Sequence, residues 1–307
     1  MNQLRVCILG AGALGQAYAL ACARGGAHVT LLNREKQATE VALRGRRLTF
    51  PRREDKFQVD WATALPTASD AILVCVRAEQ IDDALLTQLA QASSPPTAVI
   101  FVTPVMPERA ERVKAVLPHA QHSMPSLIAE FIDGEVAYWV APTPTLFSAD
   151  EQTLPAVTRL IDSLRKGGVS SKRKVNLAAY ANATTIAFFP IQLALLREPR
   201  MAAWRHTQGL LRATAHSLGL TRALAKAIGH GDPGLLFLMW VLSWNWILAI
   251  CSVVLPWIMP RFTLYLGNHF GEKLRAQHVL LYKEAAQLGA KHGIPQEYGP
   301  LLTPVAA

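Results

Sequence analysis

The first part of the chain alternates between short apolar runs and helical patterns. Val6–Leu9 is an apolar run that ends at a glycine-rich turn, Gly10–Gly15. A helical pattern follows over Gln16–Arg24, and a second apolar run covers His28–Leu32. Short apolar runs bounded by turn residues are typical of buried strands. We therefore predict a strand, a glycine turn, a helix and a second strand within about 30 residues.

The same alternation continues along the chain. Asp70–Val76 and Thr97–Thr103 are further predicted strands, and Ile81–Leu89 has a helical pattern. The later runs Glu135–Val140 and Thr145–Phe147 predict a hairpin that completes the sheet. Strands that alternate with helices indicate a parallel sheet. We predict an α/β protein, with an N-terminal Rossmann doubly wound sheet followed by a C-terminal all-helical domain.

The glycine turn has the spacing Gly-x-Gly-x-x-Gly, which is specific only in this strand–turn–helix context. Gly10 would permit the tight turn, Gly12 would let a pyrophosphate approach the backbone, and Gly15 would let helix and strand pack closely. The start of the following helix supplies free N–H groups and the positive end of its dipole. We predict a dinucleotide site; the alternative is a glycine-rich turn without a ligand. The expected contacts at this turn and at the end of the fourth strand are Gly10, Ala11, Gly12, Ala13, Leu14, Gly15 and Thr103.

The residues after the second strand set the choice of dinucleotide. An NAD site usually carries an acidic residue there, which binds the ribose hydroxyls. Here the strand is followed by Asn33, Arg34 and Glu35, and the planar guanidinium of Arg34 suits a 2′-phosphate. We predict NADP as the cofactor, with Asn33 and Arg34 in contact with it. The alternatives are that Glu35 serves as a displaced acid and that Arg34 is a solvated loop charge.

The second half contains a long apolar stretch, Leu235–Met259, which lies between the charged residues Asp232 and Arg261. By length alone it could span a bilayer. Polar residues and a proline interrupt it, and its tryptophans are scattered rather than confined to its ends. We predict two helices or one broken helix, buried inside the C-terminal domain or against another subunit. Membrane contact through 235–259 is the less favoured alternative.

The length of 307 residues suits two domains. The loop that begins at Gly167-Gly168 predicts the boundary, which gives an NADP-binding domain over 1–168 and a helical substrate or dimerisation domain over 169–307. The net charge of +9 favours a basic enzyme for anionic small molecules. Nucleic-acid binding is not expected, because no nucleic-acid motif accompanies the charge. The densest basic run, Arg44–Arg47 followed by Arg52-Arg53 and Lys56, lies inside the predicted nucleotide domain.

The four cysteines, Cys7, Cys22, Cys75 and Cys251, lie in apolar patterns without Cys-x-x-Cys spacing. They indicate core residues in a reducing compartment, and no metal site is expected. The N-terminus lacks the pattern of a signal peptide, so we expect a cytoplasmic protein that acts on a small molecule.

Several short segments fall at intervals typical of one known family. They are Ile8–Gly15, Asn33-Arg34, Ile72–Gln80, Asp133–Val136, Phe189-Pro190, His216–Gly219 and Lys291–Pro295. On these residues the sequence resembles the ketopantoate reductase family. The resemblance implies a Rossmann domain, a helical C-terminal domain and NADPH-dependent reduction of a 2-keto acid. It also places Arg77 at the family's basic residue beside the cofactor, with Gln80 in the same segment.

The catalytic positions of that family do not carry over. Alignment puts Pro104 at the family's asparagine, Ala181 at its catalytic lysine and Arg275 at its substrate-binding glutamate. Carbonyl reduction needs a proton donor near the forming alkoxide. The candidate replacements are Asn182, Arg275, which would invert the charge of the pocket, and His278, whose ordinary pKa is close to working pH. A surface asparagine and a structural histidine are the alternatives.

We therefore predict an NADPH-dependent oxidoreductase that acts on a small keto acid, carbonyl or imine other than ketopantoate. The alternative is a catalytically degenerate NADP-binding protein, a sensor or scaffold on the same fold. A homodimer is compatible with both.

Overall fold

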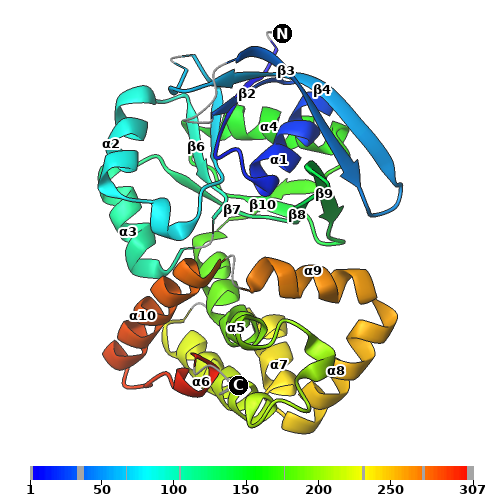
Figure 1. Ribbon diagram of the computed structural model, residues 1–307. Helices are drawn as coiled ribbons and strands as arrows, with labels where there is room; N and C mark the ends of the chain where they lie inside the picture. Colours follow the sequence, from blue (N-terminus) through cyan, green and yellow to red (C-terminus); the bar gives the residue numbers. More distant parts are fainter. Residues whose placement is uncertain are drawn as a thin grey trace. The chain divides into compact units, whose positions relative to one another are not determined.

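The computed structural model describes residues 3–32, 38–66, 68–103, 105–175, 177–229, 232–271 and 274–302. The chain forms two compact units, Met1–Pro104 with Glu108–Ala178 and Val105–Pro107 with Ala179–Ala307 (Figure 1). The first unit is α/β and the second is helical, which confirms the predicted fold class. The first unit extends to Ala178 rather than Gly168, because the short strand at Ser171–Arg173 joins its sheet.

The sheet of the first unit has eleven strands. They are β1 (Arg5–Leu9), β2 (His28–Leu32), β3 (Ala38–Arg47), β4 (Arg53–Ala62), β5 (Ala71–Val74), β6 (Ala98–Phe101), β7 (Gln121–Met124), β8 (Leu127–Ile132), β9 (Glu135–Val140), β10 (Thr145–Phe147) and β11 (Ser171–Arg173). Their order is β11-β10-β7-β6-β5-β1-β2-β4-β3-β9-β8. Strand β1 lies between β2 and β5 and is parallel to both. After β1 the chain therefore adds strands first on one side of it, beginning with β2, and later on the other side, beginning with β5. The point between β1 and β5 is the topological switch point of the sheet.

Helices cover both faces of this sheet. They are α1 (Ala13–Arg24), α2 (Asp83–Ala92), α3 (Pro107–Val116) and α4 (Leu154–Lys166). Helices α1 and α4 pack together on one face, and Figure 1 shows α2 and α3 on the other. Helix α1 contacts β1 and β2 and also β8 and β9, so the sheet curls around it. Its side chains Tyr18 and Leu20 are fully buried in the core that results.

The predicted hairpin between Glu135–Val140 and Thr145–Phe147 is wrong. Strand β9 pairs with β8 through the two-residue turn Asp133-Gly134, in which both residues have positive φ, 53° and 80°. Strand β10 instead pairs with β7 and β11, near the other end of the strand order. An Asp-Gly pair is a strong hairpin turn, whereas the link between β9 and β10 contains Pro142 and Pro144, which cannot donate ladder hydrogen bonds.

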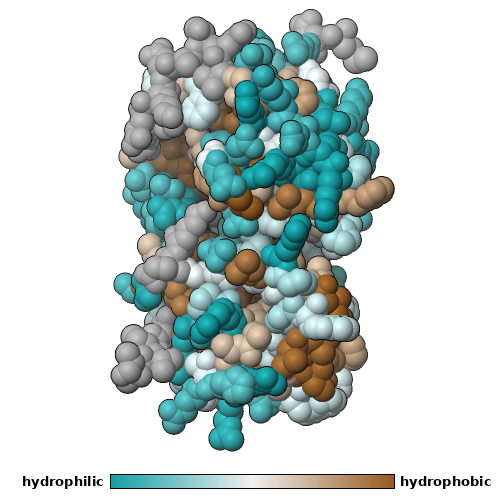
Figure 2. Space-filling view, turned by 45° about the vertical axis from the view of Figure 1, so that its right-hand side comes forward, coloured by the Kyte–Doolittle hydropathy of each residue, from teal (hydrophilic) through white to brown (hydrophobic). Residues whose placement is uncertain are grey.

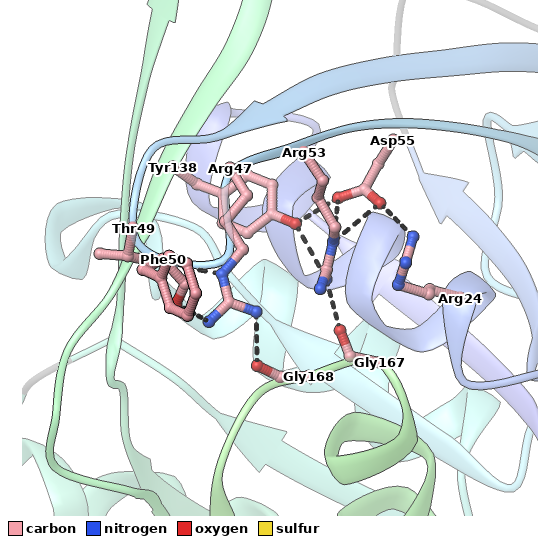
Figure 3. Close-up of polar contacts among 9 residues, drawn as sticks. All are labelled: Arg24, Arg47, Thr49, Phe50, Arg53, Asp55, Tyr138, Gly167 and Gly168. Atoms are coloured by element: carbon pink, nitrogen blue, oxygen red, sulfur yellow. Dashed lines mark hydrogen bonds and ion pairs between the residues drawn. The ribbon is translucent and has the colours of Figure 1, made fainter.

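The basic run forms a long antiparallel ribbon of β3 and β4, which the sequence pattern did not predict. Its carboxylate Asp55 is fully buried and receives hydrogen bonds from Arg24 (2.7 Å), Arg53 (3.1 Å) and the Tyr138 hydroxyl (Figure 3). These contacts join the ribbon to helix α1 and strand β9. Burial, first, and the hydrogen bond to Asp55 raise the pKa of Tyr138 to about 12, so its hydroxyl remains a donor.

Two arginines of the ribbon bind the end of helix α4 (Figure 3). Arg53 donates to the carbonyl of Gly167 at 2.6 Å, and Arg47 donates to that of Gly168 at 3.0 Å. Free carbonyls at the end of a helix carry its negative partial charge, which cations stabilise. Part of the basic run therefore has a structural role inside the first unit.

The second unit is a helical assembly. It contains most of α5 (Leu177–Arg197), then α6 (Leu210–Ala227), α7 (Pro233–Leu242), α8 (Asn245–Ile258), α9 (Pro260–Phe270), α10 (Arg275–Lys291) and the short α11 (Gly299–Leu302). Phe189 and Tyr298 meet edge to face at 5.2 Å in its core. The fully buried Trp204 donates its indole N–H to the carbonyl of Glu198 at 2.8 Å, so its one polar group is satisfied.

The apolar stretch forms two helices, α7 and α8, as predicted, and they bend by 92° at Ser243-Trp244. The prediction that these helices are buried inside the domain is wrong for most of their side chains, because only Met239, Leu248 and Ser252 are buried. Among the described helices, none is long and apolar enough to cross a membrane alone, although α7 and α8 together satisfy those criteria.

Candidate dinucleotide site and catalytic positions

The glycine turn lies at the switch point of the sheet. Gly10 directly follows β1 and has a φ of +111°, which L side chains rarely adopt. A Cβ atom there would lie 2.8 Å from the carbonyl oxygen of Cys75, just after β5. The turn therefore passes close to the carboxyl ends of β1 and β5, where ligands bind in open α/β sheets.

The other two glycines have different physical reasons. A Cβ at Gly15 would lie 1.9 Å from the carbonyl oxygen of Gly10, so the close packing of helix on turn requires glycine. At Gly12 the φ is an ordinary −70°, and an added Cβ would meet no described atom within 4 Å. Neither conformation nor internal packing requires glycine at position 12. The open space there fits the close approach of a pyrophosphate to the backbone.

The start of helix α1 suits a bound anion. Gly12 is its N-cap and provides no side-chain cap, and its first turn carries no acidic residue. The side chain of Gln16 donates to the carbonyl of Ala11 at 2.8 Å, which holds the turn in place. The next residues, Ala13 and Leu14, open the helix, so phosphate oxygens at this end would meet backbone N–H groups and the positive end of the dipole.

Three further predicted residues lie at the same edge of the sheet. Arg77 and Gln80 flank a short 3-10 turn after β5, and the Gln80 side chain accepts a hydrogen bond from the Arg77 N–H at 3.0 Å. The Arg77 guanidinium pairs with Glu79 at 3.1 Å and is about half exposed. Thr103 follows β6 and donates its hydroxyl hydrogen to the carbonyl of Val76. Because β1, β5 and β6 are parallel, these residues and Gly10 share one edge.

Two cofactor residues and one catalytic position of the sequence analysis lie outside the described residues. They are Asn33, Arg34 and Pro104. The NADP preference that rests on Arg34 stays a prediction.

The catalytic candidates lie on two helices of the second unit. Ala181 and Asn182 are near the start of α5, and the side chain of Asn182 is outside the described part of the chain. Arg275 is the exposed first residue of α10.

His278 is the most unusual of these candidates. Its side chain is 0% exposed and stacks on Phe270 at a centroid distance of 6.3 Å. Within the described structure, neither ring nitrogen has a hydrogen-bond partner. Burial lowers its pKa to about 4. The ring is therefore neutral at pH 7, unlike the near-neutral pKa expected from the sequence.

The sequence analysis missed one pair of polar residues in the first unit. His122 and Ser123 on β7 are buried, and His122 Nε2 and Ser123 Oγ have no hydrogen-bond partner among the described atoms. Burial, first, and the positive charge of Lys114 lower the pKa of His122 to about 4. The strand reads Gln-His-Ser-Met, without the apolar alternation that would have marked it. The described residues contain no cluster of three or more His, Cys, Asp or Glu side chains able to hold a metal ion.

A known protein family matches part of the first unit. Residues 6–130 match the sequence model of the ketopantoate reductase PanE/ApbA family. No curated protein matches the sequence.

Solved structures share the whole fold at low identity. A D-mandelate dehydrogenase, solved with NADH and anilino(oxo)acetate, is 15% identical and has a TM-score of 0.66, over 97% of this chain and 96% of the other. A PanE/ApbA family ketopantoate reductase from Ralstonia eutropha JMP134 is 18% identical, with a TM-score of 0.68 and coverages of 95% and 93%. A dimeric ketopantoate reductase from Staphylococcus aureus is 13% identical, with a TM-score of 0.60 and coverages of 93% and 100%. At these identities the likeness concerns the fold alone.

Proposed function

We propose that the chain is a divergent member of the ketopantoate reductase family, whose sequence model matches residues 6–130, and that it is an NADPH-dependent reductase of a small keto acid, carbonyl or imine other than ketopantoate. The observation that carries this proposal is the turn Gly10–Gly15 at the switch point, with open space at Gly12 and an uncapped helix start beside it. The shared fold of a dehydrogenase solved with NADH supports a nicotinamide dinucleotide at that edge.

Each predicted cofactor residue has a physical role in this proposal. The backbone around Gly12 would bind the pyrophosphate, and Arg77 would place a cation at the same edge of the sheet. Arg34 would bind the 2′-phosphate and so select NADP over NAD. The bound cofactor would supply the hydride.

The substrate class follows from the altered catalytic positions. The predicted alignment puts the exposed cation Arg275 at the family's glutamate, and a cation there would favour a substrate with an additional carboxylate. Asn182 is the candidate hydrogen-bond donor to the carbonyl oxygen. Neutral His278 would donate or accept a hydrogen bond rather than deliver the proton of an imidazolium at pH 7.

A second function is favoured by one specific observation. Helix α5 contains no lysine, and the predicted alignment puts Ala181 at the family's catalytic position. A dinucleotide-binding protein without the chemistry, acting as a sensor or scaffold, would have this feature and would keep the glycine turn.

The test separates binding from catalysis. NADPH and NADH are titrated against the wild type and the Gly12→Val variant, followed by the quenching of tryptophan fluorescence. We expect the valine to occupy the open space and to weaken NADPH binding at least tenfold, since charged hydrogen bonds to phosphate contribute about 1.5–3 kcal/mol each. The thermal midpoint should change little, because the Cβ atom of the new side chain meets no described atom within 4 Å.

The matched control is Gly219→Ala. Gly219 lies in helix α6, and an added Cβ there also meets nothing within 4 Å. This variant should bind NADPH as the wild type does. Equal NADPH affinity in Gly12→Val and the wild type would contradict the proposed site. If binding is confirmed, oxidation of NADPH with a panel of keto acids, aldehydes and imines distinguishes the reductase from the non-catalytic protein.

A further inference from the structure

An aromatic side chain lies fully in solvent at the tip of the β3–β4 ribbon, the segment Leu48–Arg52 between the two strands. Phe50 in this tip is 92% exposed, more than any other large apolar residue in the described part of the chain. Figure 2, in which the side of the ribbon comes forward, shows that the surface of the first unit is mostly hydrophilic there. Phenylalanine contributes most to stability when it is buried, so the fold itself gains little from this ring.

A buried arginine fixes the conformation of the tip (Figure 3). Arg47 is 8% exposed, and it donates hydrogen bonds to the hydroxyl of Thr49 at 3.2 Å and to the carbonyl of Phe50 at 3.3 Å. It also donates to the carbonyl of Gly168 at 3.0 Å, which joins the tip to the end of helix α4. The Thr49 hydroxyl accepts a further hydrogen bond from the N–H of Val140 at 3.2 Å. A single exposed apolar residue is ordinary, but a tip that is fixed in this way loses little conformational entropy when it binds a partner.

Two cations lie beside the exposed ring. Arg52 is exposed at the end of the tip, and Lys166 is exposed at the end of α4, two residues before the carbonyl that binds Arg47. Neither side chain forms an ion pair with a residue that the structure describes. The acidic residue of β4 nearest to the tip, Glu54, lies directly opposite Arg46, so a cation already faces it. The tip therefore combines one apolar ring with two free positive charges.

This combination favours a lipid surface over a protein partner. A stable protein interface buries about 800 Å² on each partner, whereas one fully exposed aromatic side chain offers only about 150–250 Å². A lipid surface needs no matching pocket, because its headgroups and acyl chains adapt to an inserted ring. Insertion of apolar side chains and attraction of cations to anionic lipids are the two contributions that bind proteins reversibly to membranes.

We propose that the tip of the ribbon docks on an anionic lipid surface. The ring of Phe50 enters the boundary between headgroups and acyl chains, and Arg52 and Lys166 bind lipid phosphates. The exposed cation Lys56 of β4 takes no part, because it lies roughly 20 Å from Phe50 at about 3.3 Å per residue. That distance exceeds the ~8 Å over which charges act at physiological ionic strength. This docking does not depend on the proposed reductase activity.

The test is flotation of the full chain with lipid vesicles. The wild type should float with vesicles of phosphatidylcholine and phosphatidylglycerol, and far less with phosphatidylcholine alone. Phe50→Ser should lower the partition coefficient at least tenfold, since burial of a phenylalanine side chain contributes about 1.5–3 kcal/mol. Arg52→Gln should lower it about fivefold, the equivalent of about 1 kcal/mol for one cation at the surface. Both residues are exposed, so circular dichroism and the thermal midpoint should match those of the wild type.

Two matched controls should bind vesicles as the wild type does. Lys56→Gln removes the same charge as Arg52→Gln, and Trp257→Ser replaces an aromatic residue that is 83% exposed in the second unit. Equal partition of Phe50→Ser and the wild type would overturn the proposal, because the net charge of +9 would then account for the binding. A wild type that floats with neither kind of vesicle would refute it as well. Loss of binding in Trp257→Ser but not in Phe50→Ser would assign the lipid contact to helix α8 and contradict the role of the tip.

Discussion

Replacing the buried imidazole of His278 should change how the stability of the helical unit depends on pH. The ring is 0% exposed, and its pKa is lowered to about 4 from an ordinary value near 6.5. Burial is the cause, since the described contacts include no hydrogen bond to either nitrogen. The unfolded chain therefore takes up a proton near pH 6.5, and the folded chain only near pH 4.

The sign and size follow from this difference. Between pH 6.5 and 4 the unfolded state binds more protons, so the free energy of unfolding falls as the pH falls through this window. A shift of about 2.5 pH units corresponds to roughly 3 kcal/mol in total, and about 2 kcal/mol of it is lost between pH 7 and pH 5. In His278→Leu this loss should disappear. At pH 7 the variant should be at least as stable, because no hydrogen bond is removed and an unpaired buried polar group is replaced.

The assay is urea unfolding at pH 7 and pH 5, followed by tryptophan fluorescence. Five of the seven tryptophans belong to the second unit, so the signal reports mainly on its unfolding. The control is His292→Gln, which changes the exposed histidine that caps the same helix and should keep the pH dependence of the wild type. If His278→Leu loses as much stability on acidification as the wild type, the reasoning about the buried ring is refuted.

Further predictions concern packing in the first unit, the choice of cofactor and the substrate. Gly15→Ala places a Cβ 1.9 Å from a backbone oxygen and should lower the free energy of unfolding by roughly 1–3 kcal/mol or more, measured by urea denaturation. Asp55→Asn removes a buried charge from two arginines and should lower it by about 3 kcal/mol, whereas the exposed Glu54→Gln should have little effect in the same assay. Arg34→Ala should weaken NADPH but not NADH in parallel titrations, and equal affinities of the wild type for both cofactors would contradict NADP selection. Steady-state assays should show poor turnover of ketopantoate, because the predicted alignment puts Ala181 at the family's lysine; loss of charge stabilisation at the oxyanion alone lowers rates by about 10²–10³.

The sequence alone determined the fold class and the place of the glycine turn. Both depend on local physics: the apolar runs of β1, β2, β5 and β6 form buried parallel strands, and the spacing of three glycines is set by one turn and one helix. The two-helix character of 235–259 was also readable, because Ser243 and Asn245 interrupt a local pattern. Cofactor choice, the catalytic residues and a cytoplasmic location stay predictions.

The tertiary structure decided what depends on partners distant in sequence. The β3–β4 ribbon reads as a basic run, and only folding shows that Arg53 and Arg47 bind the end of helix α4 and that Asp55 neutralises part of the charge. The pairing of β10 with β7 rather than β9 depends on which edge of the sheet is free, which no periodicity encodes.

Burial likewise depends on the whole fold. The hydrophobicity of a side chain favours its burial, but it does not determine which residues cover that side chain. His278 is polar but fully buried, and its lowered pKa follows from that burial. Trp257 is strongly apolar but exposed, because helix α8 packs through Leu248 and Ser252 and leaves its other sides open.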